Sequence, residues 1–300
     1  MAEPNPKMRA DKAVQQLFPA LTKRHVLEAL EHGLVQLDQR RIKKGDSVEV
    51  SRLEVIPLKT HLERLRQGNN FLSLSILWES VDEWIVDKPA GMPSHPLSLF
   101  ETETPTHWAY AQSQSISIEF PGVQPTITPH RLDAGTSGLL VVCKTHQAYE
   151  KWRERFQKKE VSKKYLAWCI GESSESCLDM SELIGHCPSD PRKMLVVSDE
   201  APGREPIQLA QTKACLLMNQ EGYSLWEVEC TTGVTHQVRV HLANAGFPLV
   251  GDSLYDPHFS ERERQLKHHC LRASELVWEE HRVVADTDQF RRGPFDPRSD

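Results

Sequence analysis

The feature that most constrains this chain is a polar loop that runs directly into an apolar strand. Residues 129–142 read PHRLDAGTSGLLVV, so a segment with both charge signs and two glycines leads into a run of aliphatic residues. Such a run predicts a buried strand, and a carboxylate at its start can be held rigidly and directed at a ligand. The glycines allow a tight turn, and nearby hydroxyl and amide groups can bind an anion. Two interpretations stay open: Asp133 is a functional carboxylate, or the segment is a surface turn with an Arg131–Asp133 contact.

A second segment combines a turn with several polar side chains. Residues 232–243 read TGVTHQVRVHLA, which predicts a turn followed by a helix with Val238 and Leu242 on one face. Gln237 and His241 share another face because they also lie four residues apart. Taken by itself, Arg239 is more often a surface cation. It gains a function only if a buried carboxylate meets it.

The N-terminal part of the chain predicts a compact module of its own. Apolar residues recur at helical spacing, and helix-capping and helix-stopping residues stand between the segments. The expected elements are a helix over 10–17 ended by Pro19, a helix capped by Thr22 and ended by Gly33, and a hairpin of residues 34–37 and 47–50.

The remaining chain mixes segments of strand length with helical segments. Strands are predicted at 75–78, 84–86, 138–143, 164–169 and 224–230, and helices at 146–158 and 236–245. The alternation is too irregular for a doubly wound parallel sheet. We therefore expect an α+β fold with a mixed, mostly antiparallel central sheet and flanking helices. The expected division is a small α+β domain at 1–56, a polar linker at 57–73, with a helical piece possible at 61–66, and a main domain at 74–300.

Composition limits the class of protein. The 300 residues carry a net charge of −6, yet residues 151–164 hold seven lysines and arginines interrupted by two glutamates. This basic run either binds nucleic-acid phosphates or is an ordinary solvated helix face. No apolar run reaches the roughly 20 residues that span a bilayer, and the N-terminus lacks the apolar core of a secretory signal. We expect a cytoplasmic location and no membrane partner.

The cysteines predict neither a disulfide framework nor a metal site. There are seven of them, an odd number, and none forms a C-x-x-C pair. In a reducing compartment we expect them to be small buried hydrophobic residues. His186-Cys187 and His268-His269-Cys270 could meet at a metal, but the ligand spacing typical of structural zinc is missing, so no metal is predicted.

Together, the two polar segments resemble the RluA-type pseudouridine synthases. The runs His-Arg-Leu-Asp-x-x-Thr-Ser-Gly-Leu and Thr-Gly-x-Thr-His-Gln-x-Arg-Val-His-Leu carry the likeness, about 100 residues apart. Three more segments resemble the family's motifs in the same order: residues 84–93 with Lys-Pro-x-Gly, residues 163–167 with Lys-x-Tyr-x-Ala, and residues 246–255 with Gly-x-Pro-x-x-Gly-Asp-x-x-Tyr. The likeness implies the pseudouridine synthase fold and an enzyme that isomerises uridine within RNA.

The N-terminal module resembles the S4 RNA-binding domain, which often precedes this catalytic domain. The likeness lies in the order of Arg9-x-Asp11-Lys12-Ala13, Thr22-Lys23-Arg24, residues 33–37 and Lys44-Gly45-Asp46. The usual Ser-Arg helix start is replaced by Thr22-Lys23-Arg24, and the usual Val-Asn-Gly turn by Leu37-Asp38-Gln39. A helix–hairpin cap that packs on the main domain is the alternative.

The resemblance also implies roles for individual residues. Asp133 matches the catalytic aspartate, Arg239 its basic partner, and Tyr165 the residue that stacks on the target base. Arg131 matches the position that enters the RNA stack when the base is flipped out. Further RNA contacts are expected from His130, Thr136, Lys163, His236 and Gln237, and from Lys23 and Arg24 of the S4-like module. Isomerisation needs no external reactant, so no cofactor is implied, and we expect a monomer.

Two departures and two alternatives limit this interpretation. Val234 stands where the family usually has an arginine, and Phe247 where it often has a histidine, so RNA affinity or substrate choice can differ. A non-catalytic RNA-binding protein would not need Asp133 facing phosphates. An unrelated hydrolase would need a nucleophile elbow, a P-loop or an H-E-x-x-H helix, and the sequence has none of these. The expected substrate is structured RNA, either ribosomal RNA of the 23S type or transfer RNA.

Overall fold

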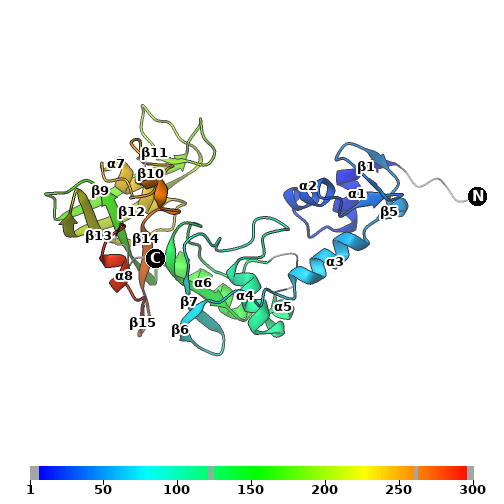
Figure 1. Ribbon diagram of the computed structural model, residues 1–300, viewed down its shortest axis with the longest axis horizontal. Coiled ribbons are helices and arrows are strands. Elements are labelled where there is room, and N and C mark those ends of the chain that lie inside the picture. The colour runs from blue at the N-terminus through cyan, green and yellow to red at the C-terminus, as the bar shows by residue number, and fades with distance from the viewer. Residues whose placement is uncertain (1–6, 121, 123–124, 260–262, 296–300) are drawn as a thin grey trace, which may run out of the picture. The chain divides into compact units, whose positions relative to one another are not determined.

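The computed structural model describes residues 7–120, 122, 125–259 and 263–295 (Figure 1). The chain forms two compact units. The first comprises residues 1–73, 95–128 and 142–146, and the second comprises residues 74–94, 129–141 and 147–300. None of the described helices combines the length and the apolar character needed to cross a bilayer.

The two predicted N-terminal helices are present in the first unit. Helix α1 spans Ala10–Leu17 and α2 spans Lys23–Glu31. The hydroxyl of Thr22 accepts the backbone N–H of His25 at 3.2 Å, so Thr22 caps α2 as predicted. Gly33 follows α2 with φ of +68°, a conformation in which glycine ends helices without strain.

The predicted N-terminal hairpin is wrong in its pairing. Strand β2 (Gln36–Leu37) pairs with β3 (Arg40–Arg41) and β5 (Leu53–Glu54), whereas β4 (Ser47–Val48) pairs with β1 (Met8–Arg9). Asp38 and Gln39 both have positive φ, as in the two-residue turns that join adjacent antiparallel strands. The pairing escaped prediction because strands of two residues carry almost no periodic signal, and β1 lies before the first helix.

The first unit continues beyond its short strands. Four further elements follow: the 3-10 helix η1 (Val50–Arg52), α3 (Ile56–Leu65), α4 (Pro105–Gln112) and α5 (Gln114–Glu119). Leu58, Leu65 and Leu99 are buried in one apolar cluster with the core residues of α1 and α2. Glu28 of α2 also accepts the backbone N–H of Leu99 at 2.8 Å.

The second unit is built on a ten-stranded sheet (Figure 1). Its strand order is β11-β10-β12-β13-β9-β14-β8-β7-β6, and β15 pairs with β14. Of the strand pairs with an assigned register, β8 with β14 is parallel and the others are antiparallel. The strands are β6 (Ser75–Glu79), β7 (Glu83–Lys88), β8 (Ser137–Cys143), β9 (Val161–Ile170), β10 (Cys177–His186), β11 (Met194–Val196), β12 (Arg204–Gln220), β13 (Tyr223–Cys230), β14 (Leu271–Trp278) and β15 (His281–Val284). The expected α+β class with a mostly antiparallel sheet is confirmed.

Helices flank the sheet at the positions where the sequence places them. Helix α6 spans His146–Gln157 and α7 spans Gln237–Asn244, close to the predicted bounds. The short elements η2 (Glu263–Gln265) and α8 (Asp288–Arg291) follow near the C-terminus. Strand β8 is buried along almost its whole length, as its aliphatic sequence predicts.

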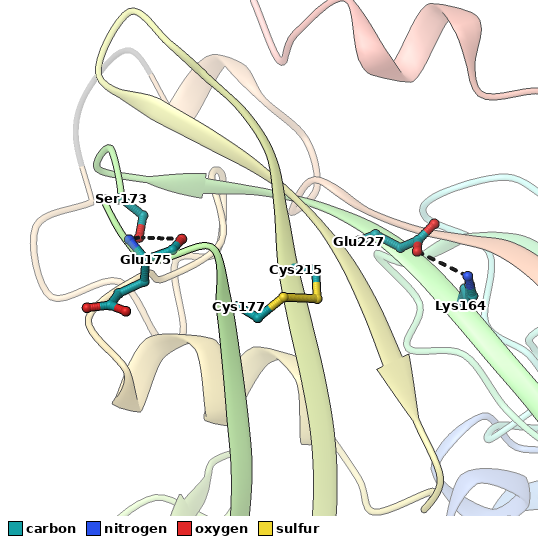
Figure 2. The surroundings of a disulfide bond; sticks show 6 residues. All are labelled: Lys164, Ser173, Glu175, Cys177, Cys215 and Glu227. Atoms are coloured by element: carbon teal, nitrogen blue, oxygen red, sulfur yellow. Dashed lines mark hydrogen bonds and ion pairs between the residues drawn. A yellow bond between two sulfur atoms is a disulfide. The ribbon is translucent and has the colours of Figure 1, made fainter.

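One pair of cysteines departs from the expectation. Cys177 of β10 and Cys215 of β12 are register partners and form a disulfide between the two neighbouring strands (Figure 2). The expectation that all seven cysteines are buried thiols is therefore wrong here, and Cys187 and Cys270 are partly exposed. Cys177 and Cys215 are separated by 38 positions in the sequence, so the sequence does not reveal that an antiparallel ladder places them directly opposite one another.

Candidate active site

Asp133 lies in the tight turn that enters β8. The backbone N–H of Thr136 donates to the carbonyl of Asp133 at 3.0 Å, which closes the turn. Gly138 then has φ of +106°, and a Cβ there would stand 2.1 Å from the carbonyl oxygen of Ala273. Glycine is required because β8 and β14 approach closely at this point. The turn is thus fixed to the sheet directly behind the carboxylate.

The residues on either side of Asp133 are held by the segment that follows β7. The hydroxyl of Ser94 donates to the carbonyl of Leu132 at 2.7 Å and accepts its N–H at 2.9 Å. On the other side, Ala134 accepts hydrogen bonds from Lys88 Nζ at 3.2 Å and from the N–H of Gly91 at 2.7 Å. These contacts of Lys88, Gly91 and Ser94 hold the backbone on both sides of Asp133.

Lys88 is a buried cation whose ammonium group binds backbone carbonyls. Besides Ala134, it donates to the carbonyl oxygens of Pro89 and Met92 at 2.9 and 2.7 Å. Burial lowers the pKa of Lys88 to about 8, although the negative charges of Asp133 and Asp87 oppose this shift.

Arg239 of α7 connects Asp133 to a second carboxylate. Its Nη1 donates to Oδ2 of Asp133 at 2.9 Å, while Nε and Nη2 donate to the two oxygens of Asp252 at 2.7 and 2.9 Å. Burial alone would raise the pKa of Asp252, but the hydrogen bonds and charge of Arg239 outweigh it and hold that pKa below its usual value. Burial opposes the charge of Arg239 as well, yet the two carboxylates raise its pKa. The structure therefore brings together the aspartate and arginine that the sequence singled out.

His236 lies beside the same carboxylate, and its protonation follows from its neighbours. The hydroxyl of Tyr255 accepts the backbone N–H of Met194 at 2.8 Å, so it can donate its own proton to Nδ1 of His236 at 2.7 Å. The ring proton of His236 then lies on Nε2, which is 3.7 Å from Oδ2 of Asp133. Burial lowers the pKa of His236 and so favours this neutral form, although the negative charge of Asp133 opposes the shift.

Asp133, His236 and Arg239 line a cavity of about 340 Å³. The turn before β8, the N-terminal half of β9, the end of β13 and the start of α7 form its walls. Its polar lining includes Asp133, Arg131, Lys163, Tyr165, His236 and Arg239. Both protein contacts of Asp133 reach Oδ2, and within the described part of the chain no residue donates a hydrogen bond to Oδ1.

Tyr165 and Lys163 reach the cavity from β9. Burial raises the pKa of the Tyr165 phenol, so the group stays protonated. The ammonium of Lys163 donates to the carbonyl of Thr232 at 3.0 Å, and burial lowers its pKa. Lys163 thereby fixes the loop that leads into α7.

Three other predicted site residues bind protein groups. The ring nitrogen Nε2 of His130 accepts the N–H of Val141 at 3.0 Å, and burial lowers the pKa of His130 to about 3. The hydroxyl of Thr136 lies 2.8 Å from Nε2 of His269. The amide of Gln237 donates to the carbonyl of Gln211 and to the hydroxyl of Thr212, at 2.8 and 2.9 Å, and it accepts from two groups of the 232–234 loop.

Arg131, Lys23 and Arg24 complete the predicted set. Arg131 is exposed and lines the cavity. Lys23 and Arg24 are exposed at the start of α2 in the first unit, where Arg24 forms an ion pair with Glu28 at 2.9 Å. Val234 packs against an apolar cluster that contains Ile184, so it is accommodated as a hydrophobic residue.

Sequence reasoning missed several residues that hold the site together. Asp252 and Tyr255 stood inside the Gly-Asp-x-x-Tyr motif, and that spacing could have been interpreted as a partner for Arg239. Lys88 could have been found in the Lys-Pro-x-Gly motif. Ser94 and His269 carry no sequence signal, because their partners lie 38 and 133 residues away. Within the described ranges no group of three or more His, Cys, Asp or Glu side chains could hold a metal ion.

Comparison with known proteins places this site in a family. The model of the RNA pseudouridylate synthase family matches residues 82–244, which include four of the five motifs described above, and the turn at 246–255 lies just beyond the match. The chain belongs to this family. A model of the S4 domain matches residues 8–52. The resemblance to pseudouridine synthases with an S4 domain is therefore confirmed.

Individual proteins that resemble this chain are also named as pseudouridine synthases. An RNA pseudouridine synthase of Synechocystis, itself uncharacterised, is 32% identical over 85% of this chain and 76% of that protein. The ribosomal large subunit pseudouridine synthase D of Nitrosomonas europaea is 28% identical over 90% of this chain and 76% of that protein. The solved structure of human RNA pseudouridylate synthase domain containing 1 aligns with a TM-score of 0.57 at 27% identity, covering 76% of this chain and 86% of that one.

Proposed function

We propose that this pseudouridine synthase isomerises specific uridines in ribosomal or transfer RNA, with Asp133 as the catalytic nucleophile. The observation that carries the proposal is the partly buried ion pair of Asp133 and Arg239 at the wall of a cavity. Ribosomal RNA is the first substrate to test, because several relatives are named ribosomal large subunit pseudouridine synthase D.

The chemistry follows from the placement of the carboxylate. Breaking the bond between uracil N1 and ribose C1′ leaves an electron-poor C1′, which Asp133 can attack through Oδ1 or stabilise electrostatically. In an alternative route, Asp133 assists the removal of the ribose 2′ proton and a glycal forms. The uracil then turns and its C5 bonds to C1′, while the bond from Asp133 to C1′ breaks in the nucleophilic route or the 2′ proton returns in the glycal route. The C5 proton is lost and N1 gains a proton. The product has the same atoms as the substrate, so the proposal needs no cofactor.

Roles for the neighbouring residues follow from their positions. Tyr165 would stack on the flipped base, and its protonated phenol suits an apolar contact. Arg131, exposed at the cavity, would enter the space that the base leaves in the RNA, which offsets part of the few kcal/mol that flipping costs. Lys163 and His236 would contact the target nucleotide. His130, Thr136 and Gln237 would act through the loops they hold.

The remaining proposals concern the whole chain. Residues 1–56 would bind structured RNA through an S4-type surface that includes Lys23 and Arg24. Residues 57–73 would link this domain to residues 74–300, which would carry out catalysis. We propose a cytoplasmic monomer whose partner is RNA.

Release of tritium from RNA that contains [5-³H]uridine tests the catalytic proposal directly. The protein should release tritium from ribosomal or transfer RNA, and Asp133→Asn should abolish release while RNA binding stays within about twofold. Unchanged release by Asp133→Asn would refute the role of Asp133. Tight RNA binding without release from any cellular RNA would indicate a non-catalytic RNA-binding protein instead.

A further inference from the structure

Arg239 is shared between two carboxylates, and the sharing is unequal. Asp252 takes a bidentate pair of hydrogen bonds from Nε and Nη2, while Asp133 receives one from Nη1. The side chain of Asp252 is 1% exposed and that of Asp133 is 16% exposed. The deeper carboxylate therefore holds two donors of the guanidinium, and the carboxylate at the cavity is left with one.

Asp252 is also held by contacts that do not involve Arg239. Its backbone N–H donates to the carbonyl of Leu249 at 3.2 Å, and its Oδ1 also accepts the N–H of Leu254 at 3.1 Å. The ring of Tyr255 lies under the guanidinium, 5.0 Å from Cζ to the ring centroid. A bidentate bond to a fixed carboxylate sets the plane of a guanidinium, and an aromatic face restricts it further.

We propose that Asp252 is a positioning residue that orients Arg239 so that it gives one hydrogen bond to Asp133 and cannot neutralise it. The inference rests on the proposed catalytic role of Asp133. With both carboxylates ionised, the three side chains carry −1 +1 −1, a net charge of −1. Without Asp252, Arg239 would be free to take both oxygens of Asp133 in a fork, and the nucleophilic oxygen would be occupied.

The other charged or titratable groups around Asp133 do not replace this function. Burial lowers the pKa of His236, which favours its neutral form, and the ring lies against the same oxygen as Arg239. Lys88 is held by three carbonyl groups. The groups that face Asp133 from the packed elements are Arg239 and His236 of the α7 segment, Lys88 of β7, Tyr165 of β9, His269 before β14, and Asp252 and Tyr255 of the turn after α7.

The test is the pH dependence of single-turnover tritium release for Asp252→Asn. The variant keeps the shape of the side chain and removes its charge. We expect the plateau rate to fall about 100-fold, the scale of a misplaced catalytic group, and the acid limb of the profile to move to lower pH. The shift in that direction is expected because the variant removes a negative charge from beside the Asp133–Arg239 pair. Binding of RNA, measured by filter retention, should change less than about twofold.

Two further variants separate orientation from folding. Asp256→Asn is the matched control, because Asp256 is also buried and lies four residues further on, and among the described residues its side chain accepts only the N–H of His258. It should leave rate and profile unchanged. Asp252→Glu restores the charge and should return the acid limb to its wild-type position even if its rate stays low.

The outcomes distinguish this inference from the proposed function. If Asp133→Asn is inactive while Asp252→Asn matches the wild type in rate and profile, the inference on Asp252 is wrong and the catalytic role of Asp133 stands. If the acid limb of Asp252→Asn moves to higher pH, Asp252 contributes only rigidity, and the charge argument is overturned. If Asp133→Asn retains release, the catalytic proposal fails whatever Asp252 does.

Discussion

Asp133 is held in place chiefly by contacts of the residues before and after it. Ser94 binds both backbone polar groups of Leu132, in the way that a neighbouring strand would. Lys88 and Gly91 bind the carbonyl of Ala134. These contacts fix the backbone around Asp133 without using its side chain, whose protein contacts reach only Oδ2. Rigid support of this kind is what keeps a reactive group within the narrow range of productive geometry.

Replacing Ser94 by alanine should therefore affect both stability and rate. The change leaves the buried N–H and carbonyl of Leu132 without their partner, which costs about 1–3 kcal/mol of unfolding free energy. The turn can then move, and we expect tritium release to slow by about 10- to 100-fold. Thermal unfolding and single-turnover assays measure the two effects.

Ser117→Ala is the matched control for this variant. Ser117 is also buried, at 6% exposure, and its hydroxyl donates to the carbonyl of Gln114 in the first unit. It should lose stability with the rate of the folded protein unchanged. Equal rates for the two variants would contradict a role for Ser94 in holding the turn.

At the level of elements, the basic run of α6 and β9 is less uniform than its sequence suggests. Arg155 is buried and paired with Glu279, Lys158 with Glu154, and Lys164 with Glu227, while Lys163 lines the cavity. A helix face offers phosphate contacts only through cations that are exposed and not already paired. Lys159, just beyond α6, is exposed and has no carboxylate partner among the described residues.

Lys159→Glu should therefore weaken RNA binding more than Lys158→Glu does. Each phosphate contact that is lost reduces the slope of log affinity against log salt by about 0.7–0.9. We expect a loss near that value for Lys159→Glu and a smaller one for Lys158→Glu, measured by filter binding across a salt series. Lys213→Glu, an exposed change on β12, controls for net charge. Equal slopes for all three variants would indicate that α6 is an ordinary solvated face.

The elements that sequence predicted are those with a strong local pattern. The aliphatic run of β8 and the capped helix α2 were predicted to within a residue or two, since their burial follows from their own residues. Strand β12 was not predicted, because the buried positions of its alternation are Ala210, Thr212 and Ala214, which are too small or too polar to mark a core. Helix α4 was missed since it is buried over most of its surface and has no polar face.

The same division holds for the site at the scale of the whole molecule. The meeting of Asp133 with Arg239, and the place of Tyr165 at the same cavity, could be predicted because these residues lie in ordered motifs. Ser94 contacts Leu132, 38 residues away, and no local pattern predicts that contact. Asp252, 13 residues from Arg239, lies in a motif that does not by itself name its partner. Sequence therefore indicates the residues that line the cavity more readily than the contacts that hold them in place.

Buried histidines give the whole molecule a defined response to acid. Burial lowers the pKa of His107, His241 and His269 to about 4, and that of His130 to about 3. In the unfolded chain each would titrate near 6.5. Below that pH the unfolded state binds protons that the folded state does not bind. The free energy of unfolding is therefore fully retained above about pH 6.5 and decreases as the pH falls toward 4.

We therefore expect the thermal midpoint to fall steeply between pH 6.5 and 4, with each buried histidine contributing up to about 1.4 kcal/mol per pH unit. His107 is in the first unit and His241 in the second, both 1% exposed, so both units should respond. Calorimetry across this range measures the effect. His241→Gln should flatten the dependence of the second unit, whereas His258→Asn, at an exposed position, should leave it unchanged. A midpoint that stays constant from pH 6.5 to 5 would show that these rings are protonated in the folded protein without cost, contrary to their burial.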